Sequence, residues 1–202
     1  MKKVKDHYYH KAKQHGFAAR SVFKLEEIDQ RHRLLKPGMK VLELGCSPGS
    51  WLQYVSGKIG PSGLLVGVDI NPPTVSLGSG KGGADGPRIR IVQGDVFELK
   101  PDELCEGSIP FDVILSDMAP KTTGVKSADA ARSSQLALRC LELATQVLRP
   151  GGSILVKVFQ GADLPELQKR FREIFQTLSR EKPQATRSES VEIFLLGKNR
   201  LF

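Results

Sequence analysis

The chain has 202 residues, of which 40% are hydrophobic and 26% are charged, as expected for a globular protein with one sizeable core. It contains no apolar run of about 20 residues, so no membrane-spanning segment is expected. The three cysteines Cys46, Cys105 and Cys140 are far apart in the sequence. Because they form no C-x-x-C pair, they predict neither a metal site nor a disulfide framework, and a reducing, cytoplasmic location is the default.

The net charge of +8 is concentrated near the N-terminus. Residues 1–40 contain eleven Lys or Arg against four Asp or Glu, which leaves the other 162 residues with a net charge of +1. We expect one domain, in which residues 1–36 form a basic helical arm on a core of residues 37–202. Such an arm indicates a polyanionic partner, with nucleic acid as the first choice, and a solvated basic face is the alternative.

The predicted elements alternate along the chain. Residues 7–30 are expected to form one or two helices, with Ser21 as an N-cap. Short apolar runs predict strands over residues 41–44, 64–70, 89–93, 111–116, 153–159 and 191–196, and helical patterns cover residues 51–59, 129–148 and 164–178. The glycine-rich residues 72–87 are expected to form a loop. This alternation favours an α/β fold, whose ligands bind beyond the carboxyl ends of parallel strands.

The first predicted strand runs into a glycine turn, within Lys40–Trp51 (K-V-L-E-L-G-C-S-P-G-S-W). Gly45 and Gly49 allow a ligand to approach the backbone, but the spacing is not the dinucleotide fingerprint G-x-G-x-x-G. Pro48 also removes one N–H donor that a pyrophosphate would need. A cofactor with an adenosine and no phosphates, such as S-adenosylmethionine, fits better. A tight turn that binds nothing is the alternative.

Three carboxylates follow the ends of predicted strands, namely Asp69, Asp95 and Asp117. They are expected to lie on one edge of the sheet. Asp69 has the spacing of an acceptor for the ribose hydroxyls, and Asp95 could accept from the adenine amino group. Asp117 would lie near the positively charged sulfonium and ammonium groups. N-capping is the alternative for each one alone.

Two charged residues fall within predicted strands near the C-terminus. Lys157 interrupts the apolar run S-I-L-V-K-V-F, so it needs a partner unless it extends into solvent. If the last strand runs antiparallel to the preceding one, Glu192 begins at the same edge of the sheet. Glu192 could then meet Lys157 and Asp117 there, and Lys24 could reach this edge from the N-terminal helix.

Taken together, these motifs resemble the FtsJ/RrmJ family (RlmE type) of S-adenosylmethionine-dependent ribosomal RNA 2′-O-ribose methyltransferases. The matching segments include F-K-L-E-E-I (23–28), Q-G-D (93–95), S-D-M-A-P (116–120), L-R-P-G-G-S (148–153), V-K-V-F-Q-G (156–161) and V-E-I-F (191–194). The resemblance implies a Rossmann-like class I methyltransferase fold: a mostly parallel seven-stranded sheet with an antiparallel last strand and helices on both faces. Its implied catalytic residues are Lys24, Asp117, Lys157 and Glu192, and its cofactor residues are Gly45, Gly49, Trp51, Asp69, Asp95 and Asp117. The chain departs from the family pattern at Cys46-Ser47 and Ser50.

The resemblance further implies methylation of a uridine ribose in large-subunit ribosomal RNA, within the assembled subunit, by a monomer without a metal ion. The 2′-oxygen would displace the methyl group directly, with an uncharged Lys157 as acceptor of the hydroxyl proton. Asp117 and Glu192 would orient the lysines.

Other functions remain open at this stage. Transfer RNA or another RNA is the main alternative substrate, and a non-catalytic RNA-binding module is a further one. Methylation of a base amino group is disfavoured because no aromatic residue follows Asp117-Met118-Ala119-Pro120. Carbon-five methylation is disfavoured because no cysteine lies at the expected active edge, and a dinucleotide-dependent oxidoreductase would need a third glycine.

Overall fold

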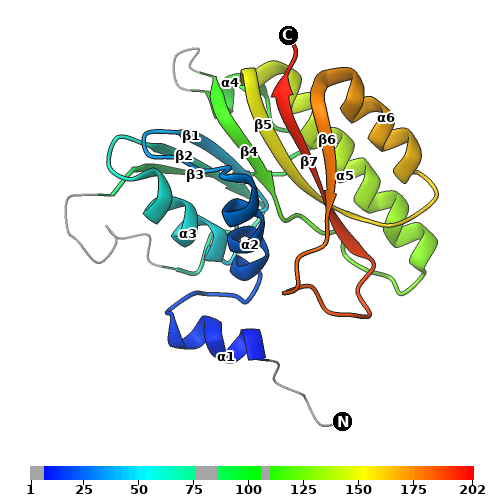
Figure 1. Cartoon of the computed structure of the whole chain (residues 1–202), viewed down its shortest axis with the longest axis horizontal. Helices are drawn as coiled ribbons and strands as arrows, with labels where there is room; N and C mark the ends of the chain where they lie inside the picture. The colour runs from blue at the N-terminus through cyan, green and yellow to red at the C-terminus, as the bar shows by residue number, and fades with distance from the viewer. Residues whose placement is uncertain (1–6, 76–85, 106–109) are drawn as a thin grey trace.

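The computed structural model describes residues 7–75, 86–105 and 110–202 (Figure 1). The helices are α1 (His7–Gln14), α2 (Val22–His32), α3 (Ser50–Ile59), α4 (Pro101–Leu104), α5 (Lys126–Val147) and α6 (Leu164–Ile174). The strands are β1 (Lys40–Leu44), β2 (Leu64–Asp69), β3 (Arg88–Gln93), β4 (Phe111–Ser116), β5 (Leu148–Phe159), β6 (Phe175–Glu181) and β7 (Glu192–Arg200). Most of the chain therefore alternates between helix and strand, as the sequence predicts.

All strands belong to one seven-stranded sheet with the order β3-β2-β1-β4-β5-β7-β6. Neighbouring strands from β3 to β5 are parallel, whereas β7 is antiparallel to both β5 and β6. In the β5–β7 pair, Phe159 lies opposite Glu192 and Lys157 lies opposite Phe194. The predicted Rossmann-like α/β fold, with a mostly parallel sheet and an antiparallel last strand, is confirmed.

Helices cover both faces of the sheet (Figure 1). Side chains of a strand alternate between its faces, so each strand supplies two cores. Leu42 and Leu44 of β1 belong to the core that contains the buried residues of α5 and α6. Val41 belongs to the core that contains the buried residues of α2 and α3. This two-sided burial explains why the strands read as continuous apolar runs.

The C-terminal region contains an element that the sequence analysis did not predict. The predicted helix over 164–178 ends at Ile174, and Phe175–Glu181 forms the edge strand β6 instead. Phe175 is buried and its ring lies 6.0 Å from that of Phe171. The short segment F-Q-T-L-S fits a helical period as well as a strand period, and pairing with β7 selects the strand.

Two local predictions near the N-terminus and the glycine turn also need comment. Ser21 makes no capping hydrogen bond to α2, and its hydroxyl instead lies 3.1 Å from the hydroxyl of Ser50 on α3. The predicted capping role was therefore wrong. Within the predicted loop 72–87, residues 72–75 and 86–87 contain no helix or strand, and the remaining residues lie outside the described part of the chain.

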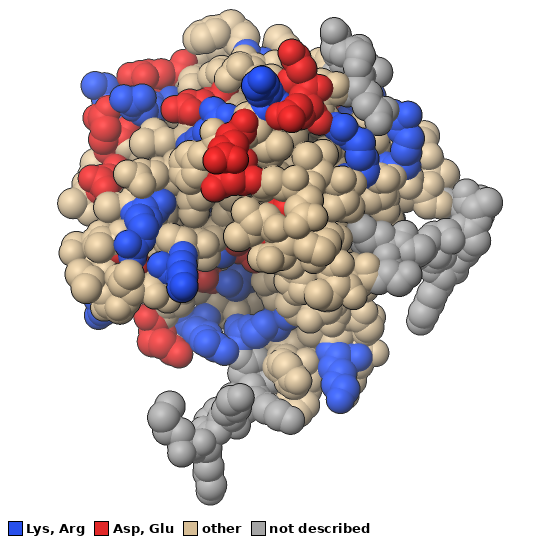
Figure 2. Space-filling view, turned by 180° about the vertical axis from the view of Figure 1, so that it is seen from behind, with Lys and Arg blue, Asp and Glu red and all other residues tan. Residues whose placement is uncertain are grey.

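The surface charge is uneven. In Figure 2, Lys and Arg predominate over Asp and Glu on the lower part of the visible face, at the end of the molecule where α1 lies in Figure 1. The upper part of the same face carries both signs side by side. Among the described residues, no helix is both long enough and apolar enough to span a membrane.

A buried carboxylate joins α2 to the rest of the structure. Asp29, which is 5% exposed, accepts a hydrogen bond from the backbone N–H of Leu35 at 2.8 Å through Oδ1. Its Oδ2 accepts from the hydroxyl of Tyr54 on α3, also at 2.8 Å. Burial and this hydrogen bond raise the pKa of the Tyr54 hydroxyl, so it remains a donor at neutral pH. The N-terminal helix α2 is thus fixed against α3 by a satisfied polar contact.

We expect Tyr54→Phe to lower the free energy of unfolding by about 1–2 kcal/mol, because it leaves a buried carboxylate oxygen without its donor. Urea titration followed by circular dichroism measures the change. Tyr9→Phe is the matched control, since the Tyr9 side chain is 46% exposed and its change should stay within about 0.5 kcal/mol. Equal midpoints for the two variants would contradict a stabilising role for the Asp29–Tyr54 contact.

Candidate active site

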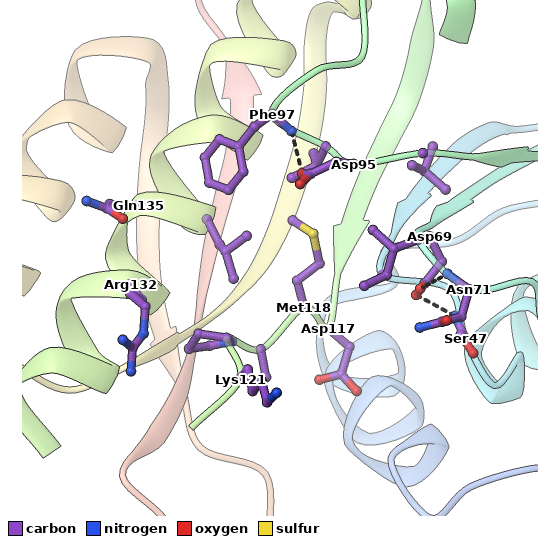
Figure 3. A pocket seen from close by; sticks show the side chains of 18 residues that line it. Ser47, Asp69, Asn71, Asp95, Phe97, Asp117, Met118, Lys121, Arg132 and Gln135 are labelled. Carbon is purple, nitrogen blue, oxygen red and sulfur yellow. Dashed lines mark hydrogen bonds between the residues drawn. The ribbon is translucent and has the colours of Figure 1, made fainter. Parts of the chain in front are cut away.

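The carboxyl ends of the parallel strands border a cavity of about 580 Å³. Its walls come from the segments that follow β1, β2, β3 and β4 and from one side of α5 (Figure 3). Four of the residues predicted from the sequence line this cavity, namely Gly45, Asp69, Asp95 and Asp117. The structure therefore brings together residues that are up to 72 positions apart in the chain.

Asp69, at the end of β2, organises the turn that follows β1. Its Oδ2 accepts a hydrogen bond from the backbone N–H of Ser47 at 2.9 Å. Its Oδ1 accepts from the backbone N–H of Asn71, also at 2.9 Å. A carboxylate has about four lone-pair positions, so Asp69 can still accept from two neighbouring hydroxyl groups of a ligand. Asp69 thus has both a structural role and the capacity to bind a ribose.

The next part of the cavity combines one carboxylate with exposed apolar side chains. Asp95 Oδ1 accepts from the backbone N–H of Phe97 at 3.0 Å (Figure 3). Ile70 and Phe97, which also line the cavity, are 62% and 51% exposed. Apolar walls beside a hydrogen-bond acceptor suit a flat ring that carries an amino group.

The two glycines of the turn differ in position. At Gly45, φ is +82° and an added Cβ would lie 2.5 Å from Met118 Cγ, so a side chain would collide with the cavity wall. At Gly49, φ is +114° and an added Cβ would lie 2.2 Å from Val75 Cγ2. Gly49 therefore allows the segment after β2 to pack on the turn, and it is not among the residues that line the cavity.

Trp51 also lies away from the cavity. Its side chain is buried, with its ring stacked on that of Phe194 at 6.0 Å. The indole N–H donates a hydrogen bond to the backbone carbonyl of Ser21 at 2.9 Å. In this structure Trp51 connects α3, α2 and β7, so any effect on a ligand would be indirect.

Two lysine–carboxylate pairs lie beyond Asp117. The Lys157 ammonium lies 2.9 Å from Asp117 Oδ1 and donates to the backbone carbonyl of Asp117 at 2.5 Å. Lys24 on α2 forms an ion pair with Glu192. The sequence analysis expected Glu192 to meet Lys157 and Asp117, and the structure pairs it with Lys24 instead. All four side chains are largely buried, with exposed fractions of 8–18%.

The sheet register explains this arrangement. Asp117 follows Ser116, which lies opposite Val156, so Asp117 lies beside Lys157. Glu192 lies opposite Phe159, which is two residues beyond Lys157 and therefore on the same face of the sheet. Diagonal neighbours of this kind are roughly 7–8 Å apart, which places the two ion pairs next to each other.

The sequence analysis missed Glu43, a buried carboxyl group in the middle of β1. Its side chain is 1% exposed, and among the described residues its Oε2 has no hydrogen-bond partner. Burial, with smaller contributions from Asp117 and Asp69, holds the pKa of Glu43 well above its ordinary value. Glu43 is therefore protonated near neutral pH. Its position between apolar residues in V-L-E-L was the available signal.

The cysteines offer no nucleophile at this site. Burial raises the pKa of the Cys46 thiol, in the turn after β1, to about 12. Burial likewise raises the pKa of Cys140 to about 12. Both thiols are protonated near neutral pH, so they do not provide the thiolate that carbon-five methylation of a pyrimidine requires. No group of three or more His, Cys, Asp or Glu side chains that could hold a metal ion occurs within the described ranges.

Comparison with known proteins gives consistent results. A family model described as FtsJ-like methyltransferase matches residues 17–200. The ribosomal RNA large subunit methyltransferase E of Desulfatibacillum aliphaticivorans is 46% identical over 193 residues, covering 96% of this chain and 89% of the relative. The protein of the same name from Syntrophobacter fumaroxidans is 44% identical over 197 residues, covering 96% and 95%.

Solved structures agree with these sequence relatives. The crystal structure of a ribosomal RNA methyltransferase from Plasmodium falciparum superposes with a TM-score of 0.74 at 26% identity, covering 92% of this chain and 99% of that one. Fibrillarin from Aeropyrum pernix, solved with natively bound S-adenosyl-L-methionine, has a TM-score of 0.56 at 17% identity and covers 81% and 68%. The latter likeness concerns the fold alone.

The sheet order, the antiparallel β7 and the cavity at the strand ends define a class I methyltransferase fold. Within this class, the chain belongs to the FtsJ-like methyltransferase family, as the sequence resemblance predicted. The cofactor of this family is S-adenosylmethionine, and the cavity has the chemistry to hold it. Its polar groups include the acceptors Asp69, Asp95 and Asp117, which suit hydroxyl, amino and cationic groups.

Glu43→Gln tests whether the buried carboxyl group is neutral. The folded chain keeps the Glu43 proton over a pH range in which the unfolded chain loses it, so the folded state binds more protons there. Stability contributed by this site therefore falls as pH rises above about 4.3. Gln cannot ionise, so the stability of the variant relative to wild type should increase between about pH 5 and 8, by up to about 1.4 kcal/mol per pH unit.

Urea titrations at several pH values measure this difference. Glu166→Gln on α6 is the matched control, because the Glu166 side chain is 64% exposed. Its stability difference from wild type should stay nearly constant with pH. A constant difference for Glu43→Gln as well would mean that Glu43 is ionised in the folded protein.

Proposed function

We propose that the protein transfers the methyl group of S-adenosylmethionine to the 2′-hydroxyl of a uridine ribose in large-subunit ribosomal RNA, within the assembled subunit. The observation that carries this proposal is the pair of buried lysine–carboxylate contacts beside the cavity, Lys157–Asp117 and Lys24–Glu192. They form the Lys-Asp-Lys-Glu set of the FtsJ-like family. The names of the sequence relatives, ribosomal RNA large subunit methyltransferase E, support the substrate class.

We also propose that the protein is a cytoplasmic monomer. Its residues 1–36 would act as a basic arm on a core of residues 37–202. The excess of Lys and Arg in the first 40 residues supports a role for this arm in RNA binding, since phosphate contacts dominate affinity for nucleic acids.

Within the cofactor cavity, Asp69 would accept the ribose hydroxyls and Asp95 the adenine amino group. Asp117 would lie near the cationic end of the cofactor, where a negative charge is favourable. Gly45 would leave room for the ligand. Gly49 and Trp51 would act from behind, by holding the turn and α3 in place.

The reaction needs a group that removes the proton of the 2′-hydroxyl. When bound, S-adenosylmethionine supplies the methyl group that the ribose oxygen accepts. Lys157, after losing its own proton, would take the hydroxyl proton on Nζ. Asp117 holds Lys157 through two contacts, and this rigid placement would contribute to the rate. Lys24, held by Glu192, would contribute positive charge next to the ribose.

Methyl transfer to defined RNAs tests the proposed substrate. We expect the purified protein to methylate large ribosomal subunits from a strain that lacks the gene, with the product mapped as one alkali-resistant linkage at a uridine. Free large-subunit RNA and transfer RNA, assayed beside the subunits, should be poor substrates. Preferred methylation of transfer RNA would replace the ribosomal proposal, and binding of RNA without transfer would indicate a non-catalytic module.

Lys157→Ala should lower turnover about 10²–10⁴-fold, the usual contribution of a positioned general base. Cofactor affinity should change little, because Lys157 does not line the cofactor cavity. Lys157→Arg should not restore activity, since a guanidinium group keeps its proton and cannot act as a base. Single-turnover methyl transfer at saturating cofactor measures the effect, and calorimetry with the cofactor verifies the site.

Lys24→Arg is the matched control for the arginine substitution. If Lys24 provides charge only, its arginine variant should retain more activity than Lys157→Arg. Transfer by Lys157→Arg at nearly the wild-type rate would mean that Lys157 acts through its charge and that another group takes the proton.

A further inference from the structure

A second cavity, of about 370 Å³, lies on the opposite side of the lysine–carboxylate pairs from the cofactor cavity. It is lined by Arg20, Ser21 and Lys24 at the start of α2 and by Arg187, Glu189, Ser190 and Glu192 between β6 and β7. Lys24 and Glu192 thus belong both to this cavity and to the proposed catalytic set, while Asp117 lines the cofactor cavity. A ribose that reaches Lys157 from the side away from the cofactor would lie next to this second cavity.

We propose that the second cavity binds a backbone phosphate of the substrate RNA, which Arg20 and Arg187 hold in place of the Glu189 carboxylate. This inference rests on the proposed function, because it takes RNA as the substrate. The 2′-oxygen and the 3′-phosphate of a nucleotide are attached to adjacent ribose carbons. Side chains that hold the reacting hydroxyl are therefore close to a phosphate, and the second cavity is the cationic space in that position.

The lining of the cavity favours an anion over a base. It contains three cations, two hydroxyl groups and two carboxylates, and no aromatic or aliphatic side chain among the described residues that form it. Guanidinium groups bind phosphate oxygens with two parallel N–H donors, which makes arginine a common phosphate ligand. A base would find no aromatic ring to stack on.

Arg20 is held in position before any ligand arrives. Its guanidinium group donates a hydrogen bond to the backbone carbonyl of Ala185 and lies over the ring of Tyr8, 5.6 Å from the centroid. Burial and the neighbouring charge of Arg187 lower the pKa of Arg20. Two like charges therefore face the same space, and an anion between them would relieve their repulsion.

Glu189 is the anion that this space now contains. Its side chain is exposed, and its own backbone N–H and the Ser188 hydroxyl lower its pKa, with further contributions from Arg187 and Arg20. It therefore carries a negative charge near both guanidinium groups. The other carboxylate, Glu192, is already paired with Lys24. An incoming phosphate would compete with Glu189 and not with the buried pair.

RNA binding at several salt concentrations tests this proposal without depending on catalysis. The probe is purified large-subunit ribosomal RNA, titrated with the full-length protein. Arg187→Gln should weaken binding about tenfold and reduce the slope of log K against log salt by about 0.7–0.9, the value for one lost phosphate contact. Glu189→Gln should have the opposite effect on affinity, because it removes the competing charge.

Arg172→Gln is the matched control, since Arg172 is an exposed arginine on α6, outside both cavities. It should leave affinity within about twofold of wild type. Urea midpoints equal to that of wild type would show that all three variants fold. In the methyl-transfer assay, Arg187→Gln should raise KM for the ribosomal subunit about tenfold and change kcat by less than about twofold.

The outcomes separate the two proposals. Weaker binding with an unchanged salt slope would overturn the phosphate subsite, because it indicates contact with a base or a sugar. Equal affinities for Arg187→Gln and Arg172→Gln would overturn it as well. If the wild-type protein methylates no RNA but the salt slopes differ as expected, the proposed reaction fails and the phosphate subsite stands.

Discussion

The antiparallel pairing of β7 with β5 is the constraint on which the site depends. In a fully parallel sheet, the residue that begins a strand lies at the amino edge, far from the cavity. Because β7 runs the other way, its first residue Glu192 lies opposite Phe159, the last residue of β5. The carboxylate is thereby brought to the edge where Asp117 and Lys157 meet. One reversed strand completes a set of four charges that five parallel strands alone could not assemble.

Charge inside the sheet is balanced unevenly. Lys157 is neutralised by Asp117, and Lys24 by Glu192, but Glu43 has no cation beside it and remains protonated. Removing charges from water costs several kcal/mol unless partners compensate, so each group adopts the form that its neighbours allow. The result is a cavity whose walls carry carboxylates on the cofactor side and whose opposite side carries the lysines. This polarity matches a cationic cofactor on one side and an anionic RNA on the other.

The sequence predicted the fold and the identity of the strand-end carboxylates because these follow from local patterns. Apolar runs of strand length, glycine turns and acids at fixed places are readable one segment at a time. The edge strand β6 was missed because F-Q-T-L-S suits either period, and only its pairing with β7 decides. The ion-pair partners were also beyond prediction: Glu192 selects Lys24 because α2 lies over the end of β7, a contact between residues 168 positions apart. Gly49 and Trp51 match the family motif but serve packing in this structure, a distinction that spacing alone does not carry.

Trp51 also gives the protein an intrinsic optical reporter. It is the chain's single tryptophan, and it touches three elements at once: α3 by covalent connection, α2 through the Ser21 carbonyl and β7 through the Phe194 ring. Its emission therefore originates at the junction between the helix that carries Lys24 and the helix that follows the glycine turn. Buried against an aromatic ring and hydrogen-bonded at its nitrogen, it should emit at short wavelength and resist quenching by iodide. Any motion that separates the RNA-facing helix from the cofactor-facing helix would expose this indole and shift its spectrum to the red, without any added label.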